Sequence, residues 1–153
     1  MSIDIRALKP GDAAMVAALH ARAGAGRPWS ATEYGAILAR TDVQGALAVA
    51  TPDGAPCGFA LWSVAAGEAE LYEIAVDLGW RRQGVGRRLM AALEESLRHQ
   101  GVSALYLEVA EDNETARRFY RSLGFEPAGR RAGYYTSGPA PVDAVVMRKA
   151  LLG

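Results

Sequence analysis

The sequence predicts a mixed α/β fold in a single domain covering residues 1–153. Apolar runs typical of strands alternate with segments of helical spacing in the order β-α-α-β-β-β-α-β-α-β-β. The strand-helix-strand order in the middle implies one parallel pair within a mostly antiparallel sheet of six or seven strands, together with about four helices. No internal repeat and no long linker divides the chain.

The first third of the chain predicts one strand followed by two helices. Apolar and polar residues alternate over 3–8, and Pro10 ends this strand and starts a helix. After the Gly- and Arg-rich segment 24–30, Ser30 and Glu33 have the spacing of a capping box, which indicates the start of a second helix. The apolar positions with helical spacing in these two helices are Met15, Val16, Leu19 and His20, and then Tyr34, Ile37 and Leu38.

The middle of the chain predicts three consecutive strands. Apolar runs at 46–50 and 59–64 flank residues 51–54, a Thr-Pro-Asp-Gly segment typical of a hairpin connection. The segment 70–76 follows the small-residue turn around Gly67 and ends before Asp-Leu-Gly. These three runs therefore predict an antiparallel meander.

The second half continues with helices and strands in alternation. Residues 84–100 form an amphipathic pattern that ends at a glycine, and 104–110 alternates with period two. Residues 113–123 again have helical spacing, and two closing strands are predicted near 125–131 and 142–148. In the strand 104–110, one side carries Leu105, Leu107 and Val109, and the other carries Tyr106 and Glu108.

Composition excludes several classes of protein. Half of the residues are hydrophobic and 22% are charged, which is enough apolar material for a packed core and excludes intrinsic disorder. Seventeen basic and seventeen acidic residues balance, so the chain lacks the bulk attraction that a general nucleic-acid binder uses. No apolar run approaches twenty residues and no signal-like segment is present, so we expect no membrane association and a cytoplasmic protein.

Cysteine and histidine are too few and too scattered for a metal site. Cys57 is the single cysteine, so an internal disulfide and a Cys-based zinc cluster are excluded. His20 and His99 lie on different predicted helices without a third ligand at metal spacing. We therefore expect no metal, and we expect both histidines at surface or helix-end positions without a general-base role.

The most informative segment is residues 81–87, Arg-Arg-Gln-Gly-Val-Gly-Arg, between the strand ending near Val76 and the amphipathic helix. Its two glycines allow close approach of a ligand, and the N–H groups of the helix N-terminus favour phosphate. A Walker A loop needs Lys-Ser/Thr after the glycines and a dinucleotide fingerprint needs a third glycine, and neither is present. A plain glycine turn with solvated arginines is the alternative interpretation.

At this junction the sequence resembles the GNAT superfamily of acetyl-CoA-dependent N-acetyltransferases. The residues from Arg81 through Gly86 match the family motif Gln/Arg-x-x-Gly-x-Gly/Ala, and the resemblance covers nearly the whole chain. Further matching positions are Ile74-Ala75-Val76-Asp77 before the loop, and Asn113, Ala116, Tyr120 and Leu123-Gly124-Phe125 after it. The resemblance implies a GNAT fold whose sheet is splayed between the fourth and fifth strands.

A narrower resemblance is to the subfamily that acetylates the N-terminal alanine of a small-subunit ribosomal protein. It rests on Pro28-Trp29-Ser30, Leu107-Glu108-Val109, Asp112-Asn113, Gly133-Tyr134-Tyr135 and Asp143-Ala144. It implies that acetyl-CoA is the cosubstrate, that the N-terminus of that ribosomal protein is the partner, and that transfer is direct. This chain departs from the subfamily pattern at Thr136 and in the loop 137–141, so the acceptor selectivity can differ.

The resemblance also implies which residues hold the cofactor. Backbone groups of one strand would pair with the pantetheine arm, the loop would wrap the pyrophosphate, and an asparagine would touch the cofactor further along. Asn113 can equally be the cap of its helix. The implied cofactor-binding residues are Ile74, Ala75, Val76, Arg82, Gln83, Gly84, Val85, Gly86, Arg87 and Asn113.

Two residues are implied for catalysis. Glu108 is the candidate base, because the strand pattern turns it away from the apolar face and the subfamily has its proton acceptor there. Glu73, on the neighbouring strand, is the rival for this role. Tyr120 is the candidate acid that protonates the departing thiolate, although its position on an apolar stripe also fits a packed tyrosine. Trp29, Tyr134 and Tyr135 are weaker candidates for contact with the acceptor peptide.

Three functional hypotheses remain after these observations. Acetylation of the ribosomal protein N-terminus is favoured. A small-molecule amine or another protein N-terminus is the alternative acceptor within the same chemistry. A non-catalytic acyl-CoA sensor is the alternative of a different class, because a fold and a cofactor loop do not by themselves establish a reaction. The sequence gives no prediction of the oligomeric state.

Overall fold

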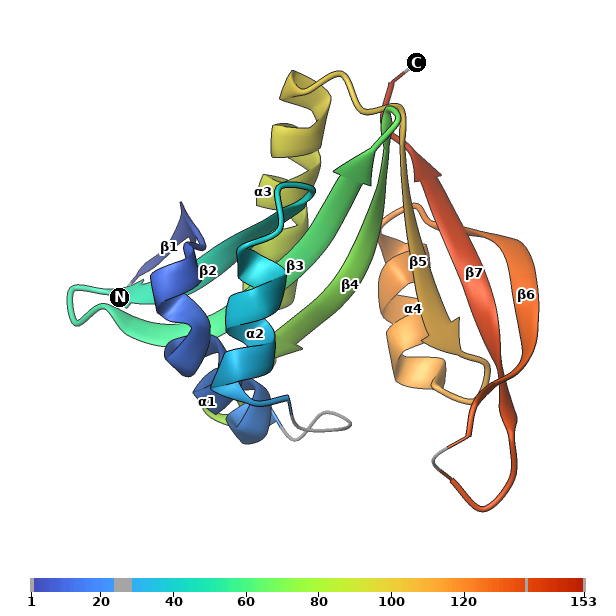
Figure 1. Ribbon diagram of the computed structural model, residues 1–153, viewed down its shortest axis with the longest axis horizontal. Helices are drawn as coiled ribbons and strands as arrows, with labels where there is room; N and C mark the ends of the chain where they lie inside the picture. Colours follow the sequence, from blue (N-terminus) through green and yellow to red (C-terminus); the bar gives the residue numbers. More distant parts are fainter. Residues whose placement is uncertain (1, 24–28, 137, 153) are drawn as a thin grey trace.

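The computed structural model describes residues 2–23, 29–136 and 138–152. One seven-stranded sheet runs through it in the order β1-β2-β3-β4-β5-β7-β6 (Figure 1). All neighbouring strands are antiparallel except the pair β4 and β5, which is parallel. The mixed fold with one parallel pair, seven strands and four α-helices confirms the predicted fold class.

The order of the elements along the chain is the predicted one. Their bounds are β1 Ser2–Ala7, α1 Ala13–Ala23, α2 Ala31–Leu38, β2 Val43–Thr51, β3 Ala55–Ala65, β4 Glu68–Val76, α3 Val85–His99, β5 Ala104–Ala110, α4 Glu114–Ser122, β6 Glu126–Tyr135 and β7 Val142–Ala150. Short 3-10 helices at Pro10–Asp12 and Leu78–Trp80 precede α1 and α3. The second, third and sixth strands are longer than their apolar runs suggested, because backbone pairing continues past the apolar residues.

The two faces of the sheet carry separate apolar cores. On one face, α1 and α2 cover β2 and β3, with Tyr34 and Phe59 fully buried and their rings in edge contact at 5.9 Å. On the other face, α3 packs on the sheet through an apolar stripe that includes Leu89, Leu93 and Leu97, and α4 packs on it through Tyr120. Burial of these stripes is the main term that stabilises the helices.

A β-bulge in β4 decides which way the side chains of that strand point. Leu61 of β3 pairs with Glu73 and the next residue, Trp62, pairs with Leu71, so Tyr72 is the extra residue. One inserted residue reverses the alternation of faces beyond it. Leu71 therefore packs in the core beneath α3, whereas Glu73 points to the face covered by α1 and α2.

The sheet opens between β4 and β5, as the resemblance implied. The two strands pair only over Glu68–Glu70 and Ala104–Tyr106, although β4 continues to Val76 and β5 to Ala110. Figure 1 shows the two strands meeting at one end and separating toward the other. The backbone of β4 beyond the bulge is therefore paired with β3 on one side only.

Candidate active site

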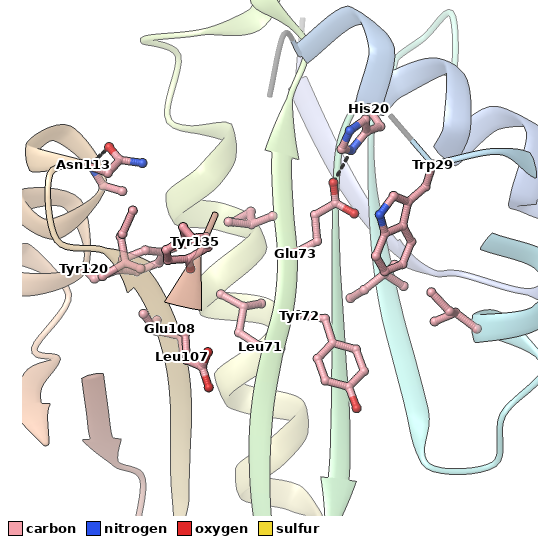
Figure 2. Close-up of a pocket in the computed structure, with 16 residues that line it drawn as sticks. His20, Trp29, Leu71, Tyr72, Glu73, Leu107, Glu108, Asn113, Tyr120 and Tyr135 are labelled. Carbon is pink, nitrogen blue, oxygen red and sulfur yellow. Dashed lines mark hydrogen bonds and ion pairs between the residues drawn. The ribbon is translucent and has the colours of Figure 1, made fainter. Parts of the chain in front are cut away.

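A cleft of about 540 Å³ lies where β4 and β5 separate. Its lining residues come from seven helices and strands, so the splay of the sheet brings segments distant in sequence together. Figure 2 shows carboxylates on both strands that border the opening. Among the residues that line it are Glu73, Ile74, Glu108, Asn113, Tyr120 and Tyr135. The cleft therefore contains the predicted base, its rival and the predicted acid.

Glu108 lies on β5 with its side chain toward the cleft. The burial of β5 alternates as predicted, with Leu107 and Val109 in the core and Glu108 on the opposite side. Its side chain is 18% exposed, and Arg131 of β6 forms an ion pair with it at 3.2 Å. The negative charge of Glu108 is therefore offset by a neighbouring cation.

Tyr120 projects from α4 into the same cleft. Only 8% of it is exposed, and its ring packs edge-on against Phe125 at 5.7 Å. Burial, with a smaller effect from Tyr135, raises the pKa of Tyr120 to about 12. The phenol therefore keeps its proton at neutral pH, as a proton donor must, and the residue both packs in the core and lines the cleft.

The glycine loop forms the start of α3. Gly84 is the N-cap with φ 79°, and no side chain caps this end of the helix. The N–H groups of Val85, Gly86 and Arg87 therefore have no partner within the helix, which is the arrangement that binds phosphate. Arg82, Gln83 and Arg87 are exposed here, and Arg82 also has a positive φ of 64°. These groups fit the pyrophosphate of an acyl-CoA, and the unpaired β4 edge at Ile74–Val76 fits its amide-rich arm.

Asn113 caps α4, which is one of the two roles that the sequence left as alternatives. Its Oδ1 accepts a hydrogen bond from the N–H of Ala116 at 3.1 Å, so it caps α4. It also lines the cleft, where the same side chain can contact a ligand. The cap fixes its position beside Tyr120.

Of the two positions expected for His20, surface or helix end, the surface one is wrong. His20 lies in the last turn of α1 but is only 7% exposed, and its Nδ1 contacts the carboxylate of Glu73 and, at 3.0 Å, the hydroxyl of Tyr34. The helical spacing groups His20 with Val16 and Leu19, but it does not show that a carboxylate of β4 packs against this face of α1. His99, in contrast, is exposed and lies 3.8 Å from Glu95 on α3, as a surface histidine should.

Comparison with known proteins places this arrangement in a family. A sequence model described as the Acetyltransferase (GNAT) family matches residues 15–125, well over half of the chain. The chain belongs to the GNAT acetyltransferase family. The matched segment contains both strands of the splay, the glycine loop and the helix that carries Tyr120.

An enzyme of Escherichia coli is similar to this chain in sequence and in structure. The [ribosomal protein bS18]-alanine N-acetyltransferase of strain K12 is 41% identical over 97 residues, which span 63% of this chain and 66% of that enzyme, slightly under two thirds of its length. The crystal structure of the E. coli ribosomal-protein-S18-alanine N-acetyltransferase superposes with a TM-score of 0.89 at 32% identity, covering 99% of this chain and 96% of that one.

A third comparison shows the fold alone. Arabidopsis thaliana NAA60 in complex with acetyl-CoA superposes with a TM-score of 0.85 at 18% identity, covering 99% of this chain and all of that one. That protein and this chain therefore share the same fold.

Aromatic side chains surround the mouth of the GNAT cleft. Trp29 and Tyr135 line the cleft and also an adjoining hollow that includes Tyr72 and Tyr134. Tyr134 packs edge-on against Tyr135 at 5.1 Å, and Arg131 lies over its ring. The fold thus brings together the three aromatic residues predicted to contact the acceptor peptide, Trp29, Tyr134 and Tyr135. Pro28 and Ser137, which belonged to the same segments, lie outside the described residues.

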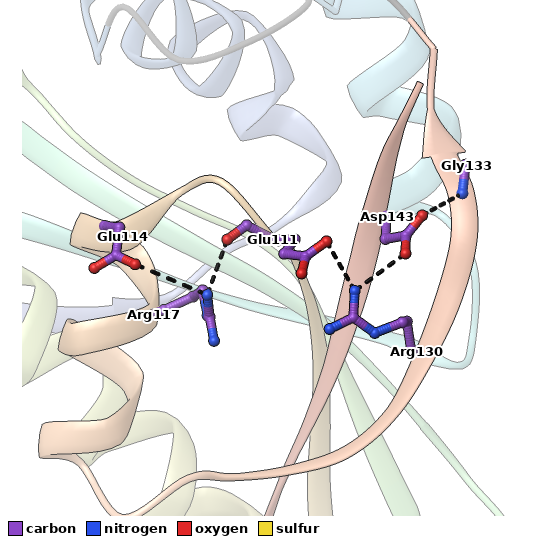
Figure 3. A network of polar contacts seen from close by, with 6 residues as sticks. All are labelled: Glu111, Glu114, Arg117, Arg130, Gly133 and Asp143. Atoms are coloured by element: carbon purple, nitrogen blue, oxygen red, sulfur yellow. Dashed lines mark hydrogen bonds and ion pairs between the residues drawn. The ribbon is translucent and has the colours of Figure 1, made fainter. Parts of the chain in front are cut away.

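A polar network fixes the β6–β7 hairpin beside the cleft (Figure 3). Arg130 binds Glu111 at 2.8 Å and Asp143 at 3.0 Å, and Asp143 also accepts the N–H of Gly133 at 2.8 Å. These contacts hold the pKa of Asp143 below its usual value. The network orients β6, the strand that carries Arg131. It therefore also positions Arg131 for its ion pair with Glu108.

In the parts of the chain that the structure describes, no three His, Cys, Asp or Glu side chains gather as a metal site. No described helix has the length and apolar character needed to span a membrane.

Proposed function

We propose that this GNAT protein transfers the acetyl group of acetyl-CoA to the N-terminal alanine of ribosomal protein S18 of the small subunit. The observation that carries the proposal is the single cleft in which Glu108, Tyr120 and the unpaired backbone of β4 face the same space. The acceptor is inferred from the similar E. coli enzyme, a [ribosomal protein bS18]-alanine N-acetyltransferase.

The cofactor is assigned to one side of the cleft. The N–H groups at the start of α3 and the exposed Arg82 and Arg87 bind the pyrophosphate, and the backbone of Ile74–Val76 pairs with the pantetheine amides. The side chain of Asn113 touches the cofactor near Tyr120. This places the thioester at the opening between β4 and β5, where the catalytic groups lie.

The chemistry needs a proton acceptor for the amine and a proton donor for the sulfur. An α-amino group has a pKa of about 7.7–8.0, so a carboxylate suffices as the base near neutral pH. Glu108 removes a proton from the attacking amine, directly or through water. Tyr120, which stays protonated because burial raises its pKa to about 12, gives its proton to the departing thiolate.

The deciding experiment measures thiol release from acetyl-CoA with a panel of acceptors and identifies each product by mass. The panel contains the S18 N-terminal peptide, the same peptide already acetylated, a peptide with only a lysine amine, and a polyamine. Acetylation confined to the free S18 peptide supports the proposal. Turnover confined to the polyamine or lysine peptide contradicts the acceptor, and acetyl-CoA binding without any turnover favours an acyl-CoA sensor.

A further inference from the structure

A three-residue polar cluster stands on the cleft wall opposite Glu108. The carboxylate of Glu73 contacts Nδ1 of His20 through Oε2, and its Oε1 accepts the hydroxyl proton of Tyr34 at 2.7 Å. His20 belongs to α1, Tyr34 to α2 and Glu73 to β4, so three elements converge to hold one carboxylate. Figure 2 shows Glu73 turned toward His20 at the edge of the cleft.

His20 and Tyr34 hold Glu73 from two helices. Nε2 of His20 is buried and has no hydrogen-bond partner among the described residues, so the polar contacts of the ring are made through Nδ1. Tyr34 donates its hydroxyl proton to the other carboxylate oxygen, Oε1. The two contacts fix the orientation of the carboxylate.

The two carboxylates of the cleft differ in their ion pairs. Glu108 has Arg131 at 3.2 Å. Among the described residues, no Lys or Arg side chain forms an ion pair with Glu73, whose carboxylate contacts His20 and Tyr34. Because 19% of the Glu73 side chain is exposed and it lines the cleft, an arriving cation meets a carboxylate that is not paired with Lys or Arg.

The reaction itself removes two protons from the acceptor. An α-amino group is mainly ammonium at pH 7, because its pKa is about 7.7–8.0. It loses one proton before its lone pair can attack, and a second as the amide forms. A single base accounts for only one of these two proton losses. The cleft holds a second carboxylate that can accept the other proton.

We propose that Glu73 binds the ammonium group of the acceptor and takes its first proton, with His20 and Tyr34 as positioning residues, and that Glu108 takes the second. The inference rests on the proposed function for its reaction. The neutral nitrogen forms a bond to the thioester carbon, the carbon–sulfur bond breaks, and sulfur leaves with the electron pair and takes a proton from Tyr120. Of the two protons lost by nitrogen, one restores Tyr120 and the other is released to water.

A binding experiment tests the first half of the proposal without turnover. With the protein saturated by CoA, affinities are measured for a peptide that begins with alanine and for its analogue that begins with propionyl, which lacks the amino group. We expect the wild-type protein to prefer the alanyl peptide at pH 6.5 by about ten- to hundredfold, the range for a hydrogen bond to a charged group. Glu73→Gln should abolish this preference.

The chain offers a matched control. Glu95 and His99 form an exposed glutamate–histidine pair on α3, outside the cleft. Glu95→Gln makes the same change of charge and should keep the wild-type preference. An alanyl preference that persists in Glu73→Gln, or one that Glu95→Gln removes equally, overturns the proposal. Thermal unfolding of each variant verifies that it is folded.

A kinetic experiment separates the two carboxylates by pH. The titratable groups facing Glu73 in the described structure are His20 and Tyr34, with Glu108, Tyr120 and Tyr135 also lining the cleft. Glu73→Gln should lower kcat/KM about tenfold or more at pH 6.5, and the loss should shrink to about threefold at pH 9, where the amine arrives neutral. An equal loss at both pH values contradicts the assignment of the first proton.

Variants of His20 test positioning. The amide of Asn can donate from nearly the place of Nδ1, so His20→Asn should retain most of the alanyl preference, whereas His20→Leu should lose it. Tyr34→Phe provides a second, independent loss of a donor. If His20→Leu keeps the preference, His20 does not position Glu73. A protein that binds the alanyl peptide through Glu73 but acetylates none of the panel contradicts the proposed function and leaves the binding assignment standing.

Discussion

The guanidinium of Arg131 lies 3.2 Å from the carboxylate of Glu108 and also over the ring of Tyr134. Arg131 belongs to β6, at the edge of the sheet, and its side chain reaches the predicted base, Glu108, on β5. The arrangement makes the β6–β7 hairpin part of the active site. It also means that substitution of Glu108 leaves an arginine without its partner.

Glu108→Gln should reduce turnover with the S18 peptide by about a hundredfold or more at pH 7, because positioned general bases contribute about 10²–10⁴ in rate. The variant keeps the shape of the side chain, so acetyl-CoA affinity should stay within about twofold. Steady-state kinetics and calorimetric titration measure the two quantities. Wild-type turnover in Glu108→Gln together with its loss in Glu73→Gln would assign the essential base to Glu73.

Tyr120→Phe should lower turnover while leaving acetyl-CoA affinity nearly unchanged, because only the proton donor is removed. Parallel loss of thermal stability and activity would instead favour a purely packing role.

The stability of the wild-type protein at alkaline pH gives a second test of Tyr120. The folded pKa of about 12 lies above the unfolded value of about 10, so Tyr120 contributes stability that is present below pH 10 and is lost as the pH rises through 12. The wild-type protein should lose stability relative to Tyr120→Phe over that range.

Much of this site follows from local pattern. The period-two alternation of 104–110 places Glu108 opposite the core residues of β5, and the apolar stripe of α3 predicts the helix whose start is the proposed phosphate site. Such features depend on residues close in sequence, whose spacing directly determines which face they occupy.

The cluster on the opposite wall does not follow from local pattern. Strict alternation over 70–76 puts Glu73 on the same face as Leu71, but the bulge at Tyr72 moves it to the other face. Its partners, His20 and Tyr34, come from helices 53 and 39 residues away in the chain. A bulge and a long-range contact leave no periodic signal in the sequence, which explains why the contact between His20 and Glu73 was not predicted.

Asp143→Asn should loosen the β6–β7 hairpin at neutral pH. Asp143 accepts hydrogen bonds from Gly133 and Arg130, and its folded pKa lies below the unfolded value of about 3.9. Its contribution to stability is therefore present above pH 3.9 and is lost as the pH falls through the folded pKa. The difference in unfolding temperature between wild type and variant should disappear at low pH. A difference that is constant with pH would contradict the role of the carboxylate charge.

Gly84→Ala should weaken acetyl-CoA binding through the backbone at the start of α3. Gly84 has φ 79° and an added Cβ would meet no atom within 4 Å, so the only local penalty is the left-handed conformation, about 1–2 kcal/mol. Relief of that strain shifts the N–H groups that bind the pyrophosphate. Gly101→Ala is the matched control, because Gly101 has φ 75° and equally open surroundings but follows the other end of α3. Both variants should lose similar stability in denaturant unfolding, and only Gly84→Ala should raise the Kd for acetyl-CoA, by about tenfold. Equal acetyl-CoA affinity in the two variants would remove the loop from the cofactor site.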